Sequence, residues 1–216
     1  ASARESIMRE ARFMGTVTAM AMHDMQNVLA IVRESAGLMG DLLRINKDVP
    51  FKHREALERA MGHITHHVER GKGILEAMSR LAHATDDNQS ESTDLSTCCR
   101  VVAQLTERLA RMKKAEVRYA GGAPALIVEA GTMPVMAAVF LGLRLVLDQP
   151  GADDRVLELS AENRAGQPVA RIATPDLKLS PADLDGLAVA LAGTGAAPQQ
   201  APGALELLFP SPGGKA

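Results

Sequence analysis

The chain carries its clearest periodic signal in residues 57–82, LERAMGHITHHVERGKGILEAMSRLA. Apolar or small side chains recur there at alternating spacings of four and three, which is the a/d pattern of helices that pack along their length. The positions are Leu57, Met61, Ile64, Val68, Gly71, Leu75, Met78 and Ala82. This stretch therefore predicts a long helix over 52–84 that needs a helical partner.

The preceding segment supplies such a partner. Residues 3–47 and 52–84 contain no proline, and Asp48-Val49-Pro50 lies between them. Because proline ends a helical pattern, we expect two long helices joined by a short turn. The first helix repeats the spacing at Met14, Thr18, Ala21, Met25, Val28, Val32, Ser35, Met39 and Leu42. An antiparallel pair alone leaves part of both seams in water, so we expect a homodimer that forms a four-helix bundle.

A second domain is expected after the hairpin. Residues 85–95, TDDNQSESTDL, are polar and turn-rich, and they predict a boundary between a domain at 1–84 and another at 92–216. Helix signals then cover 95–114, Pro134–Leu147 and Ala182–Leu191, and strand signals cover 116–119, 125–129, Val156–Glu162, Val169–Ala173 and Ala204–Phe209. Residues 164–167 suit a β-hairpin turn, and 193–203 are expected to form a loop. This mixed order predicts an α+β fold with helices on one face of a sheet.

Composition excludes several classes of protein. The 216 residues include 24 Lys+Arg against 26 Asp+Glu and are 46% hydrophobic, which is enough for a packed core and excludes disorder of the whole chain. One Tyr, four Phe and no Trp are too few for base-stacking platforms, so nucleic acid is not an expected partner. The apolar stretches 13–32 and 133–147 are interrupted by polar residues or too short for a bilayer. We therefore expect a cytoplasmic protein without membrane contact, with Cys98 and Cys99 reduced.

His23 lies in an unusual part of the first helix. Taking the seam as the a/d set, His23 falls at an f position, farthest from the partner helices, and Asp24 is the only formally charged residue between Phe13 and Val32. A solvent-facing stripe normally carries Lys and Glu, so an uncharged one suggests a surface that another protein covers. The outward positions that we expect to bind a partner are Thr16, Ala19, Met20, Gln26 and Ala30.

The residues around His23 suit phosphoryl transfer. His23 and Asn27 are four apart and share one helical face, and Asp24 is the sequence neighbour of the imidazole. A neutral imidazole is a good phosphoryl acceptor, and a nearby carboxylate can orient the ring and accept its other proton. A carboxamide can position a water or a phosphoryl oxygen without adding charge. The alternative is that His23 is simply a tolerated surface residue.

Residues 21–31, AMHDMQNVLAI, resemble the H-box of two-component histidine kinases. Arg70-Gly71, with Leu75, Met78 and Leu81, is similar to the second helix of the dimerising hairpin in that family. The resemblance covers residues 10–84. It implies that His23 is the phosphoacceptor, Asp24 the base, and Asn27 the group that assists dephosphorylation.

Beyond residue 92 the resemblance to these kinases lies in the order of elements. Their ATP-binding domain carries an Asn pair on a helix, an Asp-x-Gly-x-Gly loop and a further Gly-rich lid. The helix at 134–147 contains no Asn, and Lys178 and Ser180 replace both glycines after Asp176. A Mg²⁺-bound triphosphate needs an oxygen ligand for the metal and glycines near the phosphates. We therefore expect a degenerate histidine-kinase-ATPase-like α/β sandwich with no cofactor or metal of its own.

The resemblance implies a histidine phosphotransferase that moves a phosphoryl group between the aspartates of response regulator receiver domains, with Mg²⁺ supplied by the receiver. Two alternatives remain: a divergent ATP-dependent sensor histidine kinase core, and a non-catalytic dimeric adaptor of receiver domains. His63 and His67 have a zinc-compatible spacing but no third ligand in reach. The basic run Arg108, Arg111, Lys113 and Lys114 suits a solvated helix end, or alternatively an acidic receiver.

Overall fold

The computed structural model describes residues 2–50, 52–83, 92–122, 125–150 and 154–211, without the side chains of residues 2–17 and 19–21. The chain divides into two compact units, Ala1–Ala82 and His83–Ala216. The polar segment expected to separate two domains lies largely outside the described residues. No helix in the described part is both long enough and apolar enough to cross a membrane.

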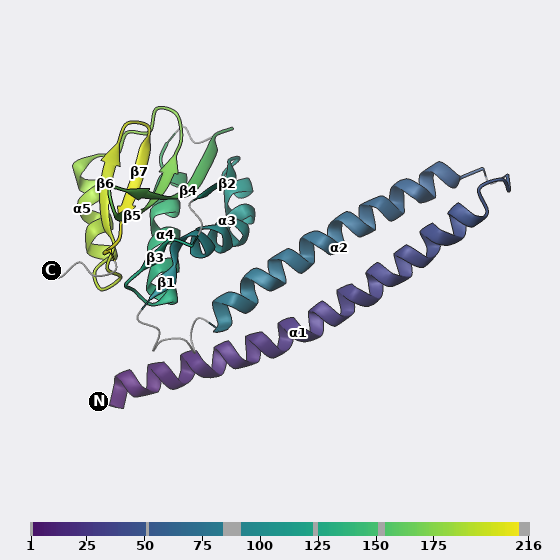
Figure 1. Cartoon of the computed structure of the whole chain (residues 1–216), viewed down its shortest axis with the longest axis horizontal. Coiled ribbons are helices and arrows are strands. Elements are labelled where there is room, and N and C mark those ends of the chain that lie inside the picture. Colours follow the sequence, from purple (N-terminus) through teal and green to yellow (C-terminus); the bar gives the residue numbers. More distant parts are fainter. Residues whose placement is uncertain (1, 51, 84–91, 123–124, 151–153, 212–216) are drawn as a thin grey trace. The chain divides into compact units, whose positions relative to one another are not determined.

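The first unit is a hairpin of two long helices, α1 (Ser2–Ile45) and α2 (Arg54–His83), which run antiparallel side by side (Figure 1). Arg54 fastens the turn between them. Its guanidinium donates hydrogen bonds to the carbonyl oxygens of Leu43 at 2.6 Å and Val49 at 3.3 Å. The last carbonyls of a helix have no partner within the helix, so the first of these bonds satisfies a group that the end of α1 leaves free, and the second holds the turn. The hairpin expected from the sequence is confirmed.

The two helices approach each other closely at small residues. A Cβ added at Gly71 would lie 3.1 Å from Cδ1 of Leu29, and one added at Gly40 would lie 3.7 Å from Cε of Met61. Met61 and Val68 on α2 are buried, as expected for its seam. On α1 the buried residues of the described part are Met22 and Ala36. Neither of these belongs to the seam that the sequence pattern predicted for the first helix.

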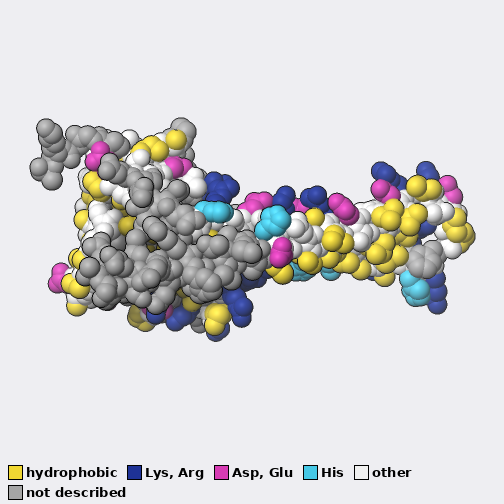
Figure 2. All heavy atoms as spheres, turned by 90° about the horizontal axis from the view of Figure 1, so that it is seen from below, with side chains coloured by type: hydrophobic (Ala, Val, Ile, Leu, Met, Phe, Trp, Pro, Cys, Tyr) yellow, Lys and Arg dark blue, Asp and Glu magenta, His cyan; other side chains and the backbone are white. Residues whose placement is uncertain are grey.

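The predicted seam of α1 instead forms an exposed apolar face. Its members Met25, Val28, Val32, Met39 and Leu42 are each at least 39% exposed. At about 100° per residue, this face lies roughly a quarter of a turn round the helix from the face that contacts α2. Apolar side chains form a continuous band along the hairpin in Figure 2. Part of both seams was expected to lie in water in a single hairpin, and on α1 these five members do; we call them the apolar ridge.

The second unit contains a five-stranded sheet in the order β2-β4-β5-β7-β6. The strands are β2 (Glu116–Gly122), β4 (Val156–Arg164), β5 (Gln167–Ala173), β6 (Ala197–Ala201) and β7 (Ala204–Leu208). β2 pairs with β4 in parallel, and the other pairs are antiparallel. A small second sheet joins β1 (Thr93–Asp94) to β3 (Ile127–Val128). Three helices cover one face of the large sheet (Figure 1): α3 (Leu95–Met112), α4 (Thr132–Leu147) and α5 (Pro181–Ala190).

The core of this unit lies between α4 and the sheet. Val139 and Leu143 on α4 are fully buried, as are Leu159, Ile172 and Leu205 on three neighbouring strands. Gly142 lets α4 approach the sheet, because an added Cβ would lie 3.0 Å from Cδ1 of Leu207. The expected α+β fold with helices on one face is therefore confirmed.

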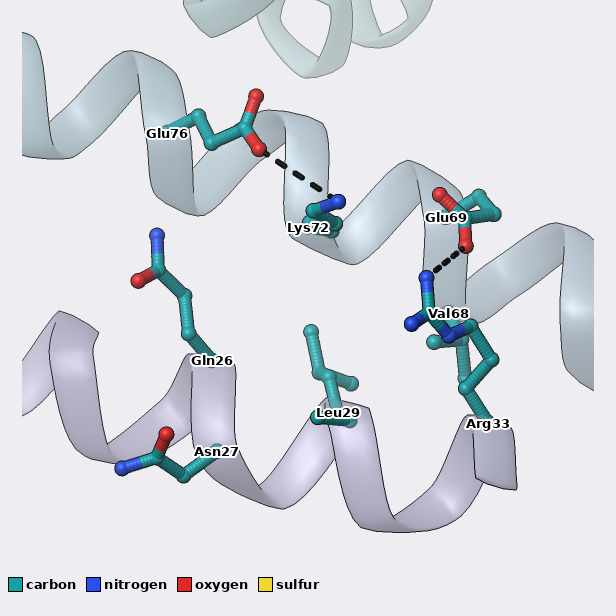
Figure 3. Close-up of a pocket in the computed structure, with 9 residues that line it drawn as sticks. Gln26, Asn27, Leu29, Arg33, Val68, Glu69, Lys72 and Glu76 are labelled. Carbon is teal, nitrogen blue, oxygen red and sulfur yellow. Dashed lines mark hydrogen bonds and ion pairs between the residues drawn. The ribbon is translucent and has the colours of Figure 1, made fainter. Parts of the chain in front are cut away.

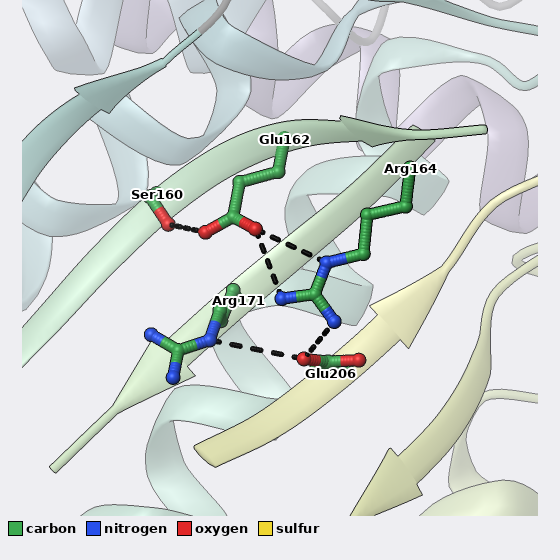
Figure 4. A network of polar contacts seen from close by, with 5 residues as sticks. All are labelled: Ser160, Glu162, Arg164, Arg171 and Glu206. Carbon is green, nitrogen blue, oxygen red and sulfur yellow. Dashed lines mark hydrogen bonds and ion pairs between the residues drawn. The ribbon is translucent and has the colours of Figure 1, made fainter. Parts of the chain in front are cut away.

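The opposite face of the sheet carries a network of charged side chains (Figure 4). Arg164 on β4 forms ion pairs with Glu162 at 3.0 Å and with Glu206 on β7. Arg171 on β5 lies 3.7 Å from the same Glu206 carboxylate. Only 4% of the Glu206 side chain is exposed. A buried carboxylate is costly unless it is paired, so two guanidinium groups explain how Glu206 is tolerated.

Two short strands, β1 and β6, are elements that the sequence pattern missed. The segment 193–203, expected to be a loop, contains β6, whose sequence APQQA lacks the β-branched and aromatic residues typical of strands. Its pairing with β7 supplies the stabilisation that its own residues do not.

Cys98 and Cys99 are buried on α3 and unpaired. Burial raises the pKa of the Cys98 thiol to about 11, and it raises the pKa of Cys99 further.

Candidate functional site

His23 projects from α1 into solvent, as expected for an f position, and 73% of its side chain is exposed. Asp24 is 85% exposed, and its carboxylate lies 3.7 Å from Nδ1 of His23. The amide nitrogen of Asn27 lies 3.5 Å from the same Nδ1. The structure thus brings together the three residues that the sequence selected as a catalytic group.

Both neighbours of the imidazole approach the same ring nitrogen. Within the described part of the chain, no side chain forms a hydrogen bond or an ion pair with Nε2 of His23. The Asp24 carboxylate beside Nδ1 favours a proton on that nitrogen, whereas the Asn27 amide NH2 can donate only to an Nδ1 without a proton. In the tautomer with the proton on Nδ1, the Nε2 lone pair is free toward solvent. At 3.7 Å the Asp24 contact is longer than a hydrogen bond, so this carboxylate acts on the ring through its charge. The arrangement suits a nucleophilic Nε2.

A cleft between α1 and α2 starts one helical turn from His23 (Figure 3). Its volume is about 330 Å³, and its lining residues are Gln26, Asn27, Leu29, Ala30, Arg33, Val68, Glu69, Lys72 and Glu76. Two of the expected partner-binding residues, Gln26 and Ala30, therefore line it. Thr16, Ala19 and Met20 belong to α1, but their side chains lie outside the described residues.

Charged side chains edge this cleft, and the sequence interpretation did not select them. Arg33 reaches across from α1 to Glu69 at 3.2 Å, and Lys72 lies 3.9 Å from Glu76 (Figure 3). Arg33 is the first charged residue after Asp24 in the sequence, which is a signal that the uncharged surface ends there. The cleft residues of α2 could not be selected from the sequence, because their place opposite α1 depends on how the two helices are aligned. In the structure Gly71 of α2 lies opposite Leu29 of α1.

The loop after Asp176, which stands where the histidine kinases have an Asp-x-Gly-x-Gly loop, is held in place by hydrogen bonds. Gln200 of β6 accepts a hydrogen bond from the backbone of Leu179 and donates one to the carbonyl of Leu177, both at 2.9 Å. Ser180, which replaces a glycine of the family pattern, caps α5 in a capping box with Asp183. Hydrogen bonds from the side chain and backbone of Ser180 lower the pKa of the Asp183 carboxyl. Ser180 thus has a structural role at the start of α5.

The other histidines do not form a metal site with their neighbours. His63, His66 and His67 are exposed on α2, and the rings of His66 and His67 meet edge to face with centroids 5.6 Å apart. In the portion of the chain that is described, no three His, Cys, Asp or Glu side chains are grouped so that they could hold a metal ion.

No protein-family model and no curated protein matches the chain. Among solved structures, the chain is similar to the catalytic domain of histidine kinase ThkA, at 9% identity and a TM-score of 0.44 over 56% of this chain and 94% of that one. It is also similar to the histidine kinase AdeS of Acinetobacter baumannii, at 15% identity and a TM-score of 0.44 over 86% and 96%. A third similar structure is ThkA in complex with the response regulator protein TrrA, at 12% identity and a TM-score of 0.41 over 95% and 65%.

Proposed function

We propose that the protein is a histidine phosphotransferase of a two-component phosphorelay, which carries a phosphoryl group between receiver-domain aspartates on His23. The observation that supports this most directly is the exposed imidazole with Asp24 and Asn27 both at Nδ1 and with Nε2 unoccupied by a described neighbour. The resemblance of residues 21–31 to an H-box supports the same function.

The transfer follows from the geometry of the ring. The lone pair of Nε2 attacks the phosphorus of an aspartyl phosphate, the phosphorus–oxygen bond to the aspartate breaks, and its electrons stay on the leaving carboxylate. The ring keeps its Nδ1 proton and becomes positively charged. The Asp24 carboxylate, 3.7 Å from Nδ1, stabilises that charge or accepts the proton. Attack by the aspartate of a second receiver reverses these steps.

The proposed protein is a homodimer whose apolar ridge is covered by a second copy. In a four-helix bundle each helix packs against two neighbours, so it buries two faces roughly a quarter of a turn apart. Within a single chain α2 covers one of these two faces of α1. The apolar ridge is the second face, which the second copy covers in the proposed dimer. Val32 is nine residues after His23, roughly half a turn round the helix. Dimerisation through the ridge therefore leaves His23 accessible.

The proposed partner is a receiver domain that docks on the exposed side of α1 and over the cleft lined by Gln26 and Ala30. Thr16, Ala19 and Met20 extend the proposed surface toward the N-terminus. The receiver supplies Mg²⁺, which takes oxygen ligands from carboxylates. In the proposed function the second unit binds no nucleotide. Lys178 and Ser180 stand where glycines would let the backbone approach phosphates, and Ser180 caps α5.

The test separates transfer from autophosphorylation. The protein is incubated with labelled ATP alone and then with each receiver domain of its own organism, labelled on its aspartate. We expect no label from ATP and label on the protein from at least one receiver. His23→Gln should abolish that label, whereas His66→Gln, which changes another exposed histidine, on α2, should not.

Two results would contradict the proposal. Label from ATP on His23 would make the protein an autokinase. Tight binding of a receiver without any transfer, unchanged in His23→Gln, would make it an adaptor.

A further inference from the structure

The exposed residues of α3 are unusual in their charge. Five residues of this helix are exposed, namely Arg100, Gln104, Arg108, Arg111 and Met112. Their spacing places them along one side of the helix, over roughly 18 Å at 1.5 Å per residue. We call Arg100, Arg108 and Arg111 the arginine stripe. No acidic residue is exposed on α3, because its single one, Glu107, is half-buried.

The arginine stripe is not neutralised by the rest of the unit. None of its three guanidinium groups forms a hydrogen bond or an ion pair with a described residue. By contrast, Lys113 at the end of the helix pairs with Asp148 at 3.0 Å, and Arg118 on the neighbouring strand pairs with Glu116 at 2.6 Å. The whole chain has a net charge of -2. The stripe is therefore a local concentration of free positive charge on a slightly acidic protein.

We propose that the arginine stripe is a second contact surface for the receiver partner and binds an acidic part of that protein. This inference rests on the proposed function for the identity of the partner. A receiver that carries an aspartyl phosphate and binds Mg²⁺ must gather several carboxylates, since Mg²⁺ takes oxygen ligands. Such a protein has a negative field, which a stripe of free arginines attracts.

The composition of the stripe favours a protein over a nucleic acid as its binding partner. Met112, at the end of the stripe, is 73% exposed. Arg and Met are both enriched in protein–protein interfaces. The one Tyr of the chain, Tyr119, is partly buried on β2 and its pKa is raised, first of all by burial. A surface without exposed aromatic rings has no platform on which bases could stack.

The experiment measures binding without transfer. The probe is one receiver domain from the same organism: the one that exchanges phosphate with the protein fastest or, if none exchanges, the one that binds the protein most tightly. The affinity of this receiver is measured for His23→Gln, and the substitutions below are added to that variant. Arg108→Glu and Arg111→Glu should each weaken binding about threefold to tenfold at low ionic strength, mainly through slower association. High salt should reduce the difference, because it screens exposed charges. Arg108→Lys, which keeps the charge, should bind almost as the parent does.

Lys178→Glu is the matched control, since it makes the same charge change at an exposed residue elsewhere in the unit. An affinity loss in Lys178→Glu equal to that in the stripe variants, or no loss in the stripe variants, would overturn the proposal. So would binding of duplex DNA that the stripe variants lose. If receivers bind through the stripe but never transfer phosphate to His23, the proposed function fails and the contact surface stands. If phosphate is transferred and binding is unaltered in the stripe variants, the contact surface fails and the proposed function stands.

Discussion

The amide nitrogen of Asn27 lies 3.5 Å from Nδ1 of His23, one turn along α1. This places the carboxamide beside the ring but not at Nε2, the nitrogen that accepts the phosphoryl group in the proposed reaction. Asn27 also lines the cleft between α1 and α2. Its position therefore suits the control of water near a phosphorylated His23 better than the transfer itself.

Replacement of Asn27 should lengthen the life of the phosphohistidine. In Asn27→Ala no amide remains to hold a water near the phosphoryl group, so hydrolysis should slow about tenfold, which corresponds to about 1.4 kcal/mol in the barrier. Transfer to a receiver should change less, since the receiver supplies its own carboxylate. The measurement is the half-life of labelled phosphohistidine in the purified protein. Gln26→Ala, a neighbouring change in the same cleft, should leave that half-life as it was; an equal effect in both would remove the specific role of Asn27.

Dimerisation should depend on the apolar ridge. Val28 is 52% exposed in the single chain, so Val28→Glu costs little in a monomer, but it buries an unpaired charge in the proposed bundle. The dissociation constant of the dimer should rise at least about a hundredfold, or about 2.8 kcal/mol. Sedimentation velocity over a concentration series measures it. Thr65→Glu introduces the same charge on the opposite side of the hairpin and should leave the dimer intact. A monomeric parent protein would contradict the ridge as an interface.

The ridge also shows how far the sequence could predict the structure. Proline placement and heptad spacing predicted the hairpin and the burial of Met61 and Val68 on α2, because those signals are local. The pattern on α1 predicted an apolar face but not its neighbour, since Met22 and Ala36, which face α2, carry no stronger signal than Val28 or Val32. The cleft needs residues of both helices, and its lining depends on a register that no single helix encodes. His23, Asp24 and Asn27 were predictable because one helical turn joins them.

Gly142 should be a position where added volume is destabilising. A Cβ there would meet Cδ1 of Leu207 at 3.0 Å and Cδ1 of Ile172 at 3.1 Å. Gly142→Val forces α4 away from the sheet and should cost about 2 kcal/mol of unfolding free energy. Gly186→Val on α5 meets nothing within 4 Å, so its effect should be close to zero. The chain has one Tyr and no Trp, and Tyr119 lies on β2. Its near-ultraviolet signal in urea therefore reports unfolding of the second unit, and equal stability of the two variants would refute the packing argument.

Acid should weaken the second unit through Glu162. Burial opposes ionisation of this carboxyl, but hydrogen bonds from Arg164 and Ser160 outweigh it, so the pKa of Glu162 lies below its usual value. A carboxyl with a lowered pKa in the folded state stabilises the fold above its unfolded pKa, about 4.3 for Glu. That contribution disappears as the pH falls through the folded pKa.

The parent should therefore lose urea resistance below about pH 4.3, with Tyr119 as the probe. Glu162→Gln cannot lose a charge there, so its stability should fall less steeply over the same range. Glu158→Gln, an exposed carboxyl on the same strand, should retain the steeper dependence of the parent. Parallel curves for all three proteins would show that the ion pairs of Figure 4 contribute no acid sensitivity.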